Sequence, residues 1–119
     1  LLQNGRKINE RDSFGATPLL IAMVAGQEKM VDFLLSRKAN PKISAKEGYT
    51  LMHGAAFSGK KTLIRKALSL GLEVNPRYGS NGITPTDVAE DEGDALPYLR
   101  ALGGRTAWEL GRKPDPADK

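Results

Sequence analysis

The feature that most constrains the fold is a glycine- and threonine-containing pattern that occurs three times at nearly constant spacing. Gly15, Gly48 and Gly82 begin the three copies and are 33 and 34 residues apart. The matched positions are Gly15, Thr17, Pro18, Leu19, Ala22 and Gly26, then Gly48, Thr50, Leu51, Met52, Ala55 and Gly59, then Gly82, Thr84, Pro85, Thr86, Ala89 and Gly93. A period of this length is typical of repeat proteins, in which each unit buries its apolar face on its neighbours. The sequence therefore predicts a stack of similar units.

Each copy predicts a tight turn followed by two helices. The first glycine supplies a backbone conformation with positive φ. The threonine two residues later can cap a first helix, which proline begins in two of the copies. A second glycine ends this helix eleven residues after the first glycine. A second helix is expected over residues 30–35 and 63–68, because these segments are apolar at i, i+1, i+4 and i+5.

Two motifs indicate a known family. Residues 17–19, 50–56 and 84–85 resemble the Thr-Pro-Leu-His-x-Ala-Ala signature of ankyrin repeats. Residues 35–40 and 68–75 resemble the Leu-x-x-Gly-Ala-Asp-Val-Asn segment that closes such a repeat. The resemblance implies an all-α ankyrin-repeat solenoid, built from helix-turn-helix repeats with short β-hairpin finger loops.

The sequence departs from the family pattern at two positions of the first complete unit. Leu20 stands where histidine is usual, and Lys38 replaces the glycine after the second helix. In the next unit His53 keeps the family's place beside Thr50. The resemblance therefore implies that His53 is a structural residue.

The repeats suggest the following organisation of one ankyrin-repeat domain over residues 1–110. Residues 1–11 match the end of a repeat whose helices are missing, so we expect the sequence to be a fragment or to lack preceding residues. The expected parts are repeats over residues 12–44 and 45–78, a more polar terminal repeat over 79–103, a capping helix over 104–110 and a disordered tail over 111–119. Trp108 and Leu110 are expected to cover the last repeat.

Composition and charge limit the function classes. With 39% hydrophobic and 27% charged residues the chain is expected to be soluble and folded. It contains no apolar run near the ~20 residues of a membrane span, and we expect a cytoplasmic location, although a secreted or periplasmic form stays open. There is no cysteine, which excludes disulfides, a thiolate nucleophile and a Cys-ligated zinc.

No motif predicts catalysis, and we expect no enzyme, cofactor or metal. Gly54-x4-Gly59-Lys60 imitates a phosphate-binding loop, but Lys61 occupies the next position and Gly54 falls inside a predicted helix. His53 is the only histidine, so it has no second histidine or cysteine for a metal site. The acidic residues at 90–94 lack the alternating spacing of a calcium loop.

In ankyrin-like folds the partner usually lies in the concave groove formed by the finger tips and the first helices. That resemblance implies ten candidate partner-binding residues: Phe14, Ala16, Val24, Lys46, Glu47, Tyr49, Phe57, Ser58, Ile83 and Asp91. The apolar members, Phe14, Val24, Tyr49, Phe57 and Ile83, are expected to form an exposed stripe. Tyr49 and Phe57 are its best candidates, since Phe14 and Ile83 could instead pack between adjacent fingers.

These features predict non-catalytic recognition of another protein, as an adaptor, a scaffold, or an inhibitor of the immunity-protein kind. An alternative is nucleic-acid or other polyanion binding, because the chain carries a formal charge of +4 and has basic residues on its second helices. These residues are Arg37, Lys38, Lys60, Lys61, Arg65 and Lys66. A third possibility is that the chain is a targeting segment of a larger enzyme.

Overall fold

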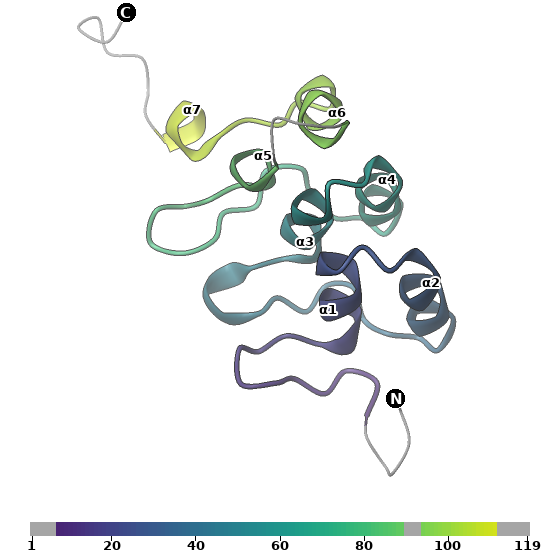
Figure 1. The fold of residues 1–119 in the computed structure, drawn as a ribbon. Coiled ribbons are helices and arrows are strands. Elements are labelled where there is room, and N and C mark those ends of the chain that lie inside the picture. Colours follow the sequence, from purple (N-terminus) through teal and green to yellow (C-terminus); the bar gives the residue numbers. More distant parts are fainter. Residues whose placement is uncertain (1–6, 90–93, 112–119) are drawn as a thin grey trace, which may run out of the picture.

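The computed structural model describes residues 7–89 and 94–111. In these residues the chain forms the helices α1 (Pro18–Val24), α2 (Glu28–Ser36), α3 (Leu51–Ser58), α4 (Lys61–Ser69), α5 (Pro85–Val88), α6 (Ala95–Ala101) and α7 (Ala107–Gly111), and the 3-10 helix η1 (Lys46–Gly48). The helices α1, α3 and α5 stack in one row, α2, α4 and α6 form a second row beside it, and long loops project from the first row (Figure 1). The predicted all-α solenoid of helix-turn-helix units is confirmed.

The turns and helix caps follow the repeated pattern. Gly15, Gly48 and Gly82 have φ values of 78°, 88° and 65°, which favour glycine. The threonine that follows each of them caps the next helix, because its side chain accepts a hydrogen bond from a backbone N–H three residues on. The equivalent positions therefore carry equivalent local structure in all three units.

The projecting loops are the fingers, over residues 12–16, 45–49 and 78–83. Antiparallel bridges join Ala45 to Tyr49 and Tyr78 to Ile83. In the first finger the Asp12 N–H donates to the Ala16 carbonyl oxygen over 2.9 Å. Each finger is thus closed by a single backbone pairing, and within the described residues none extends into a regular strand.

The core lies between the two rows of helices. Its large, fully buried members come from every unit and include Leu19, Met23, Val31, Leu34, Met52, Ile64 and Leu99. Within the first row, α1 and α3 are in close contact at Gly54 of α3, where an added Cβ would lie 3.0 Å from the Leu20 side chain and 3.1 Å from that of Val24. A glycine inside a helix lowers helix propensity, and here it makes room for the side chains of α1.

The helices α2, α4 and α6 end in the same way. In each, the second residue after the helix has a left-handed backbone, with φ of 70° at Lys38, 90° at Gly71 and 96° at Gly103. The next N–H donates to a carbonyl five residues back, for example Ala39 to Leu34 over 3.0 Å. This is the Schellman motif, in which glycine is the preferred left-handed residue. Lys38 is therefore the one strained member of the three.

The third unit differs from its predicted form. Its first helix was expected to reach residue 92, but α5 ends at Val88 because Ala89 adopts an extended backbone with ψ of 140°. Residues 90–93, which include the candidate Asp91, lie outside the described residues. A capping box joins Thr84 and Asp87 at the start of α5.

The capping helix α7 forms, but the expectation that Trp108 and Leu110 cover the last repeat was wrong. These side chains are 60% and 38% exposed. Trp108 follows its threonine by two residues, as Leu19 does in α1 and Met52 does in α3, and both of those side chains are buried. In the described part of the chain no second helix follows α7. Its indole therefore stays largely in solvent.

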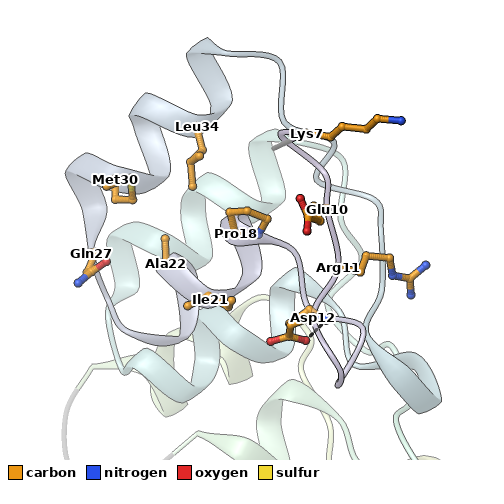
Figure 2. A pocket seen from close by; sticks show the side chains of 11 residues that line it. Lys7, Glu10, Arg11, Asp12, Pro18, Ile21, Ala22, Gln27, Met30 and Leu34 are labelled. Carbon is orange, nitrogen blue, oxygen red and sulfur yellow. Dashed lines mark hydrogen bonds between the residues drawn. The ribbon is translucent and has the colours of Figure 1, made fainter. Parts of the chain in front are cut away.

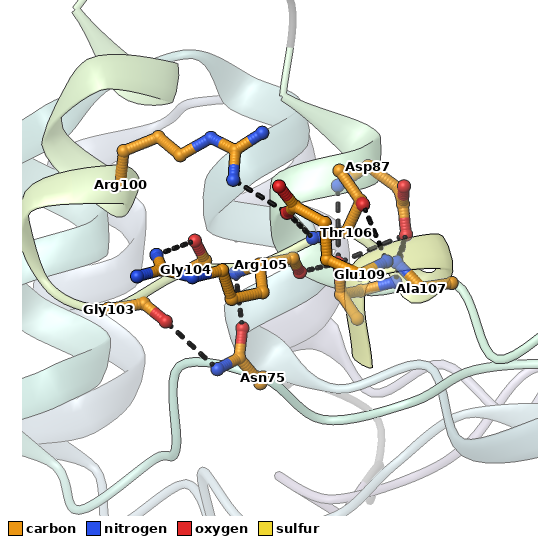
Figure 3. Close-up of polar contacts among 10 residues, drawn as sticks. Asn75, Asp87, Arg100, Gly103, Gly104, Arg105, Thr106, Ala107 and Glu109 are labelled. Atoms are coloured by element: carbon orange, nitrogen blue, oxygen red, sulfur yellow. Dashed lines mark hydrogen bonds and ion pairs between the residues drawn. The ribbon is translucent and has the colours of Figure 1, made fainter. Parts of the chain in front are cut away.

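Polar contacts join α7 and the segment before it to the rest of the stack (Figure 3). The Ala107 N–H donates to Asp87 Oδ2 over 2.7 Å. Asn75 binds the segment between α6 and α7 at two places, donating to the Gly103 carbonyl oxygen over 3.1 Å and accepting from the Arg105 N–H over 2.8 Å.

Among the described helices, none has the length and apolar character that crossing a bilayer requires.

Candidate functional site

Backbone hydrogen bonds join the three finger tips into one row. The Lys46 N–H of the second finger donates to the Phe14 carbonyl oxygen of the first over 3.0 Å. The Gly79 N–H of the third finger donates to the Glu47 carbonyl oxygen over 2.9 Å. The Arg11 guanidinium adds a further link, because its Nη2 donates to the Ser44 carbonyl oxygen over 2.7 Å. The spacing of the tips is therefore fixed before any partner binds.

Four of the ten candidate residues are exposed on the fingers and first helices. Phe14, at the tip of the first finger, is 73% exposed, and Phe57, near the end of α3, is 54% exposed. Lys46 and Glu47 are exposed at the tip of the second finger. Phe14 is thus not packed between adjacent fingers. These residues expose two aromatic rings and one charge of each sign.

The expectation that Tyr49 is among the most exposed members was wrong. Its ring is half-buried, stacked on the His53 ring with the centroids 5.1 Å apart, and it meets the edge of the Tyr78 ring at 4.9 Å. Burial raises the pKa of the Tyr49 hydroxyl, and the neighbouring Tyr78 raises it further. Tyr49 therefore contributes mainly to the contact between the second and third fingers.

The remaining described candidates, Ala16, Val24, Ser58 and Ile83, are also half-buried. Val24 lies against Gly54 of the next unit. Ser58 Oγ donates to the Ala55 carbonyl over 2.6 Å and accepts from the Lys60 N–H, so it closes the end of α3. The expected stripe of five exposed apolar side chains is therefore replaced by the two exposed rings of Phe14 and Phe57.

His53 is bonded as a structural residue. The Thr50 N–H donates to His53 Nδ1 over 3.0 Å, so the ring proton is on Nε2, which donates to the Ile83 carbonyl oxygen over 2.7 Å. Burial lowers the pKa of His53, against the opposing effect of the Ile83 carbonyl. With both nitrogens bonded, no lone pair is left for a metal ion. Within the described residues, no group of three or more His, Cys, Asp or Glu side chains could hold one.

Basic residues of the second helices contact the neighbouring units. Lys60 Nζ lies 3.6 Å from the Glu28 carboxylate, and Lys66 Nζ lies 3.1 Å from that of Asp32. The Lys61 ammonium lies over an aromatic ring of α6, 5.6 Å from its centroid. These cations are thus partly engaged within the chain.

One feature was missed by the sequence analysis. Ile21 of α1 is 51% exposed and lines a cavity at the N-terminal end of the stack (Figure 2). The sequence aligns Ile21 with Gly54, one repeat period later, and Gly54 is buried in the stack. An apolar residue at a position that is buried in the next unit indicates that Ile21 lies on a face of the kind that packs against a neighbouring unit.

Comparison with known proteins identifies the family. The sequence model for ankyrin repeats in three copies matches residues 1–102. The chain belongs to the ankyrin-repeat family. Ankyrin repeats are generally protein–protein interaction modules. The family's helix pairs and fingers account for the rows of helices and projecting loops seen here.

Several curated ankyrin-repeat relatives are similar in sequence. The inactive serine/threonine-protein kinase TEX14 of Bos taurus is 35% identical over 83 residues, which cover 68% of this chain and 6% of the relative. NF-kappa-B inhibitor delta of Mus musculus is 32% identical over 90 residues, covering 75% and 28%. The putative ankyrin repeat protein FPV031 of fowlpox virus (strain NVSL) is 35% identical over 94 residues, covering 75% and 28%. The chain thus spans between 6% and 28% of the length of these relatives.

Proposed function

We propose that this ankyrin-repeat chain is a non-catalytic module that binds a partner protein through its finger tips and the ends of its first helices. The contact centres on Phe14 and Phe57, with Lys46 and Glu47 between them in the chain order. The half-buried residues Ala16, Val24, Tyr49, Ser58 and Ile83 lie in the same fingers and first helices. Asp91, which lies outside the described residues, is kept as a candidate.

The observation that carries the proposal is the pair of hydrogen bonds between finger tips. A surface that is already ordered loses little conformational entropy on binding, so more of the contact energy appears as affinity. Exposed aromatic rings on such a surface are the side chains that most often dominate protein binding. Phe14 and Phe57 combine large exposed area with a rigid support.

The role of the complex is proposed from the relatives. One of them is named as an inhibitor of NF-kappa-B, which is consistent with a module that masks its partner. A scaffold or adaptor role uses the same surface, and the two roles differ only in whether the partner's own activity falls on binding. We favour the masking role, and measuring the partner's activity with and without the chain distinguishes them.

The test is affinity capture from a lysate of the source cell with the wild-type chain and a Phe14→Glu/Phe57→Glu variant. Both side chains are largely in solvent, so the variant is expected to fold, which circular dichroism checks. The matched control is Phe33→Glu, because Phe33 is also an exposed aromatic residue, at 42%, but lies on α2 in the other row of helices.

A protein retained by the wild type and by Phe33→Glu, and lost by the double variant, supports the proposal. Retention of the same proteins by all three chains contradicts it. Retention of nucleic acid alone, released as salt is raised, would instead support the polyanion alternative.

A further inference from the structure

The third finger carries an asparagine–glycine pair at its tip. Asn81 lies directly before Gly82, at the place that Phe14 and Glu47 take in the first and second fingers, and its side chain is exposed. A backbone nitrogen can attack the carboxamide of the preceding asparagine, and glycine favours this attack because no Cβ crowds the approach. A phenyl ring and an ionised carboxylate do not react in this way. The third finger therefore carries a reactive group that the other two lack.

The other described asparagines are held away from such a reaction. The Asn75 carboxamide donates one hydrogen bond and accepts another, and the Asn40 carboxamide accepts one. Both residues precede proline, whose nitrogen has no hydrogen to lose. Asn9 accepts a backbone N–H and precedes the larger glutamate. The Asn81 carboxamide, by contrast, forms no hydrogen bond with the described residues, so it can rotate toward the next nitrogen.

The turn of the third finger controls access to the attacking nitrogen. Gly82 has a φ of 65°, and its N–H donates to the Gly79 carbonyl oxygen over 3.0 Å. The nitrogen can attack only when this bond opens. A single backbone pairing, between Tyr78 and Ile83, closes the finger, and exposed loop tips of this kind open locally at low cost in free energy. The fold is therefore expected to slow the reaction but not to prevent it.

The Arg77 guanidinium lies beside the attacking residue. An added Cβ at Gly82 would be 2.7 Å from both Nε and Nη2 of Arg77. Arg77 forms no hydrogen bond or ion pair with another described residue. A nearby cation stabilises the deprotonated form of an acidic group, which here is the backbone nitrogen that attacks. The third finger thus places a carboxamide, a glycine and an unpaired cation together.

We propose that Asn81 is a site of intramolecular deamidation. The deprotonated Gly82 nitrogen attacks Asn81 Cγ and closes a succinimide ring. As the new N–Cγ bond forms, the Cγ–Nδ2 bond breaks, and ammonia leaves with the proton that the backbone nitrogen lost. Water then adds to either carbonyl of the ring and breaks its bond to nitrogen, which gives aspartate or isoaspartate. The sequence of steps consumes water alone and requires no oxidant or reductant.

Either product changes the row of finger tips. The formal charge of +4 falls by one unit, because a neutral carboxamide becomes a carboxylate. Isoaspartate also lengthens the main chain by one carbon between residues 81 and 82, within the turn that Tyr78 and Ile83 close. The Gly79 N–H, which bonds this finger to the Glu47 carbonyl oxygen, lies in the same turn. The modification therefore acts beside the bond that sets the third tip in the row.

The test is peptide mapping by mass spectrometry after the whole chain has been incubated at mildly alkaline pH and body temperature. Trypsin releases residues 78–100, in which Asn81 is the only asparagine, and residues 67–77, in which Asn75 is the only one. The first peptide is expected to gain the mass difference between asparagine and aspartate, and the second is expected to stay unchanged. A second Asn-Gly pair, residues 4–5 outside the described residues, falls in a different tryptic peptide.

Isoaspartate is a second readout. Protein isoaspartyl methyltransferase transfers a methyl group from S-adenosylmethionine to an isoaspartyl carboxylate. It should therefore methylate the peptide of residues 78–100 from the incubated chain but not the same peptide from a fresh chain.

Two comparisons separate this reaction from general ageing of the chain. Asn81→Gln keeps an exposed carboxamide but needs a larger ring, so its peptide should react at least about tenfold more slowly. In guanidinium chloride, where the bond from Gly82 to Gly79 is open, the wild-type peptide should react severalfold faster. A peptide of residues 78–100 that stays unreacted in the folded chain after the unfolded chain has reacted completely overturns the proposal. So does an equal mass gain in Asn81→Gln.

Discussion

Replacing Lys38 by glycine should stabilise the protein, although it removes a whole side chain. Lys38 has a left-handed backbone with φ of 70° in the Schellman motif that ends α2. The Lys38 side chain is exposed and forms no hydrogen bond or ion pair with the described residues. Lys38→Gly therefore breaks no hydrogen bond or ion pair with the described residues, and its effect on the free energy of unfolding comes from the backbone conformation alone.

The expected gain comes from that backbone conformation. A residue with a Cβ pays about 1 kcal/mol to adopt the left-handed region, and glycine does not. Lys38→Gly should therefore raise the free energy of unfolding by about 1 kcal/mol and the melting temperature by roughly 4 °C. Urea unfolding followed by circular dichroism measures this, and the midpoint should rise without a change in the slope with denaturant.

Two control variants test the reason for the gain. Lys38→Ala keeps the Cβ and the strain, so its free energy of unfolding should stay within about 0.5 kcal/mol of the wild type. Gly103→Ala is the reverse change at the equivalent position, where an added Cβ meets nothing within 4 Å, and it should destabilise by about 1 kcal/mol. Loss of stability in Lys38→Gly, or an equal gain in Lys38→Ala, would refute the explanation.

Three further perturbations follow from buried polar groups and close contacts. Burial lowers the pKa of His53 in the folded chain, so as pH falls the unfolded chain binds a proton on this histidine before the folded chain does. The free energy of unfolding should therefore fall as pH drops below 6.5, the ordinary pKa of histidine. In His53→Asn, the dependence of the unfolding free energy on pH should lack this contribution. Thr86 Oγ1 is buried and has no hydrogen-bond partner among the residues that the structure describes, so Thr86→Val should raise the unfolding free energy by about 1 kcal/mol. Gly104→Ala should lower it by at least ~2 kcal/mol, because the new Cβ would lie 2.7 Å from the Leu99 carbonyl oxygen. Urea titrations measure all three, the first across a series of pH values.

Opposite results would be informative in each case. A pH slope that is the same in His53→Asn would assign the proton uptake to other groups. A less stable Thr86→Val would mean that the hydroxyl has a partner in solution. A Gly104→Ala chain as stable as the wild type would show that the segment between α6 and α7 shifts easily.

Local structure was predictable from the sequence because it depends on residues close together in the chain. The turn glycines, the threonine caps and the bonding of His53 to Thr50 are all set within a few residues. The repeat period then extended these features to a stack, since equivalent sequences form equivalent units. The departure at Lys38 was also visible as a missing glycine.

Exposure was not predictable in the same way, because it depends on the neighbouring unit. Tyr49 is half-buried through contact with Tyr78, which lies in the next finger, whereas Phe14 has no comparable ring above it among the described residues. The two residues lie on opposite sides of the turn glycine, because Phe14 precedes Gly15 whereas Tyr49 follows Gly48. In each finger the residue before the glycine is exposed and the residue after it is half-buried, a difference that the structure shows and the motif alone does not.

Photo-cross-linking would test most directly whether the finger tips and first helices bind a partner. A benzophenone-bearing amino acid replaces Phe14, Phe57 or Phe33 in turn, and each chain is irradiated in a lysate of the source cell. We predict that positions 14 and 57 cross-link to the same protein and that position 33 does not. Cross-links to a protein from position 33 alone, or to nucleic acid alone, would contradict the account.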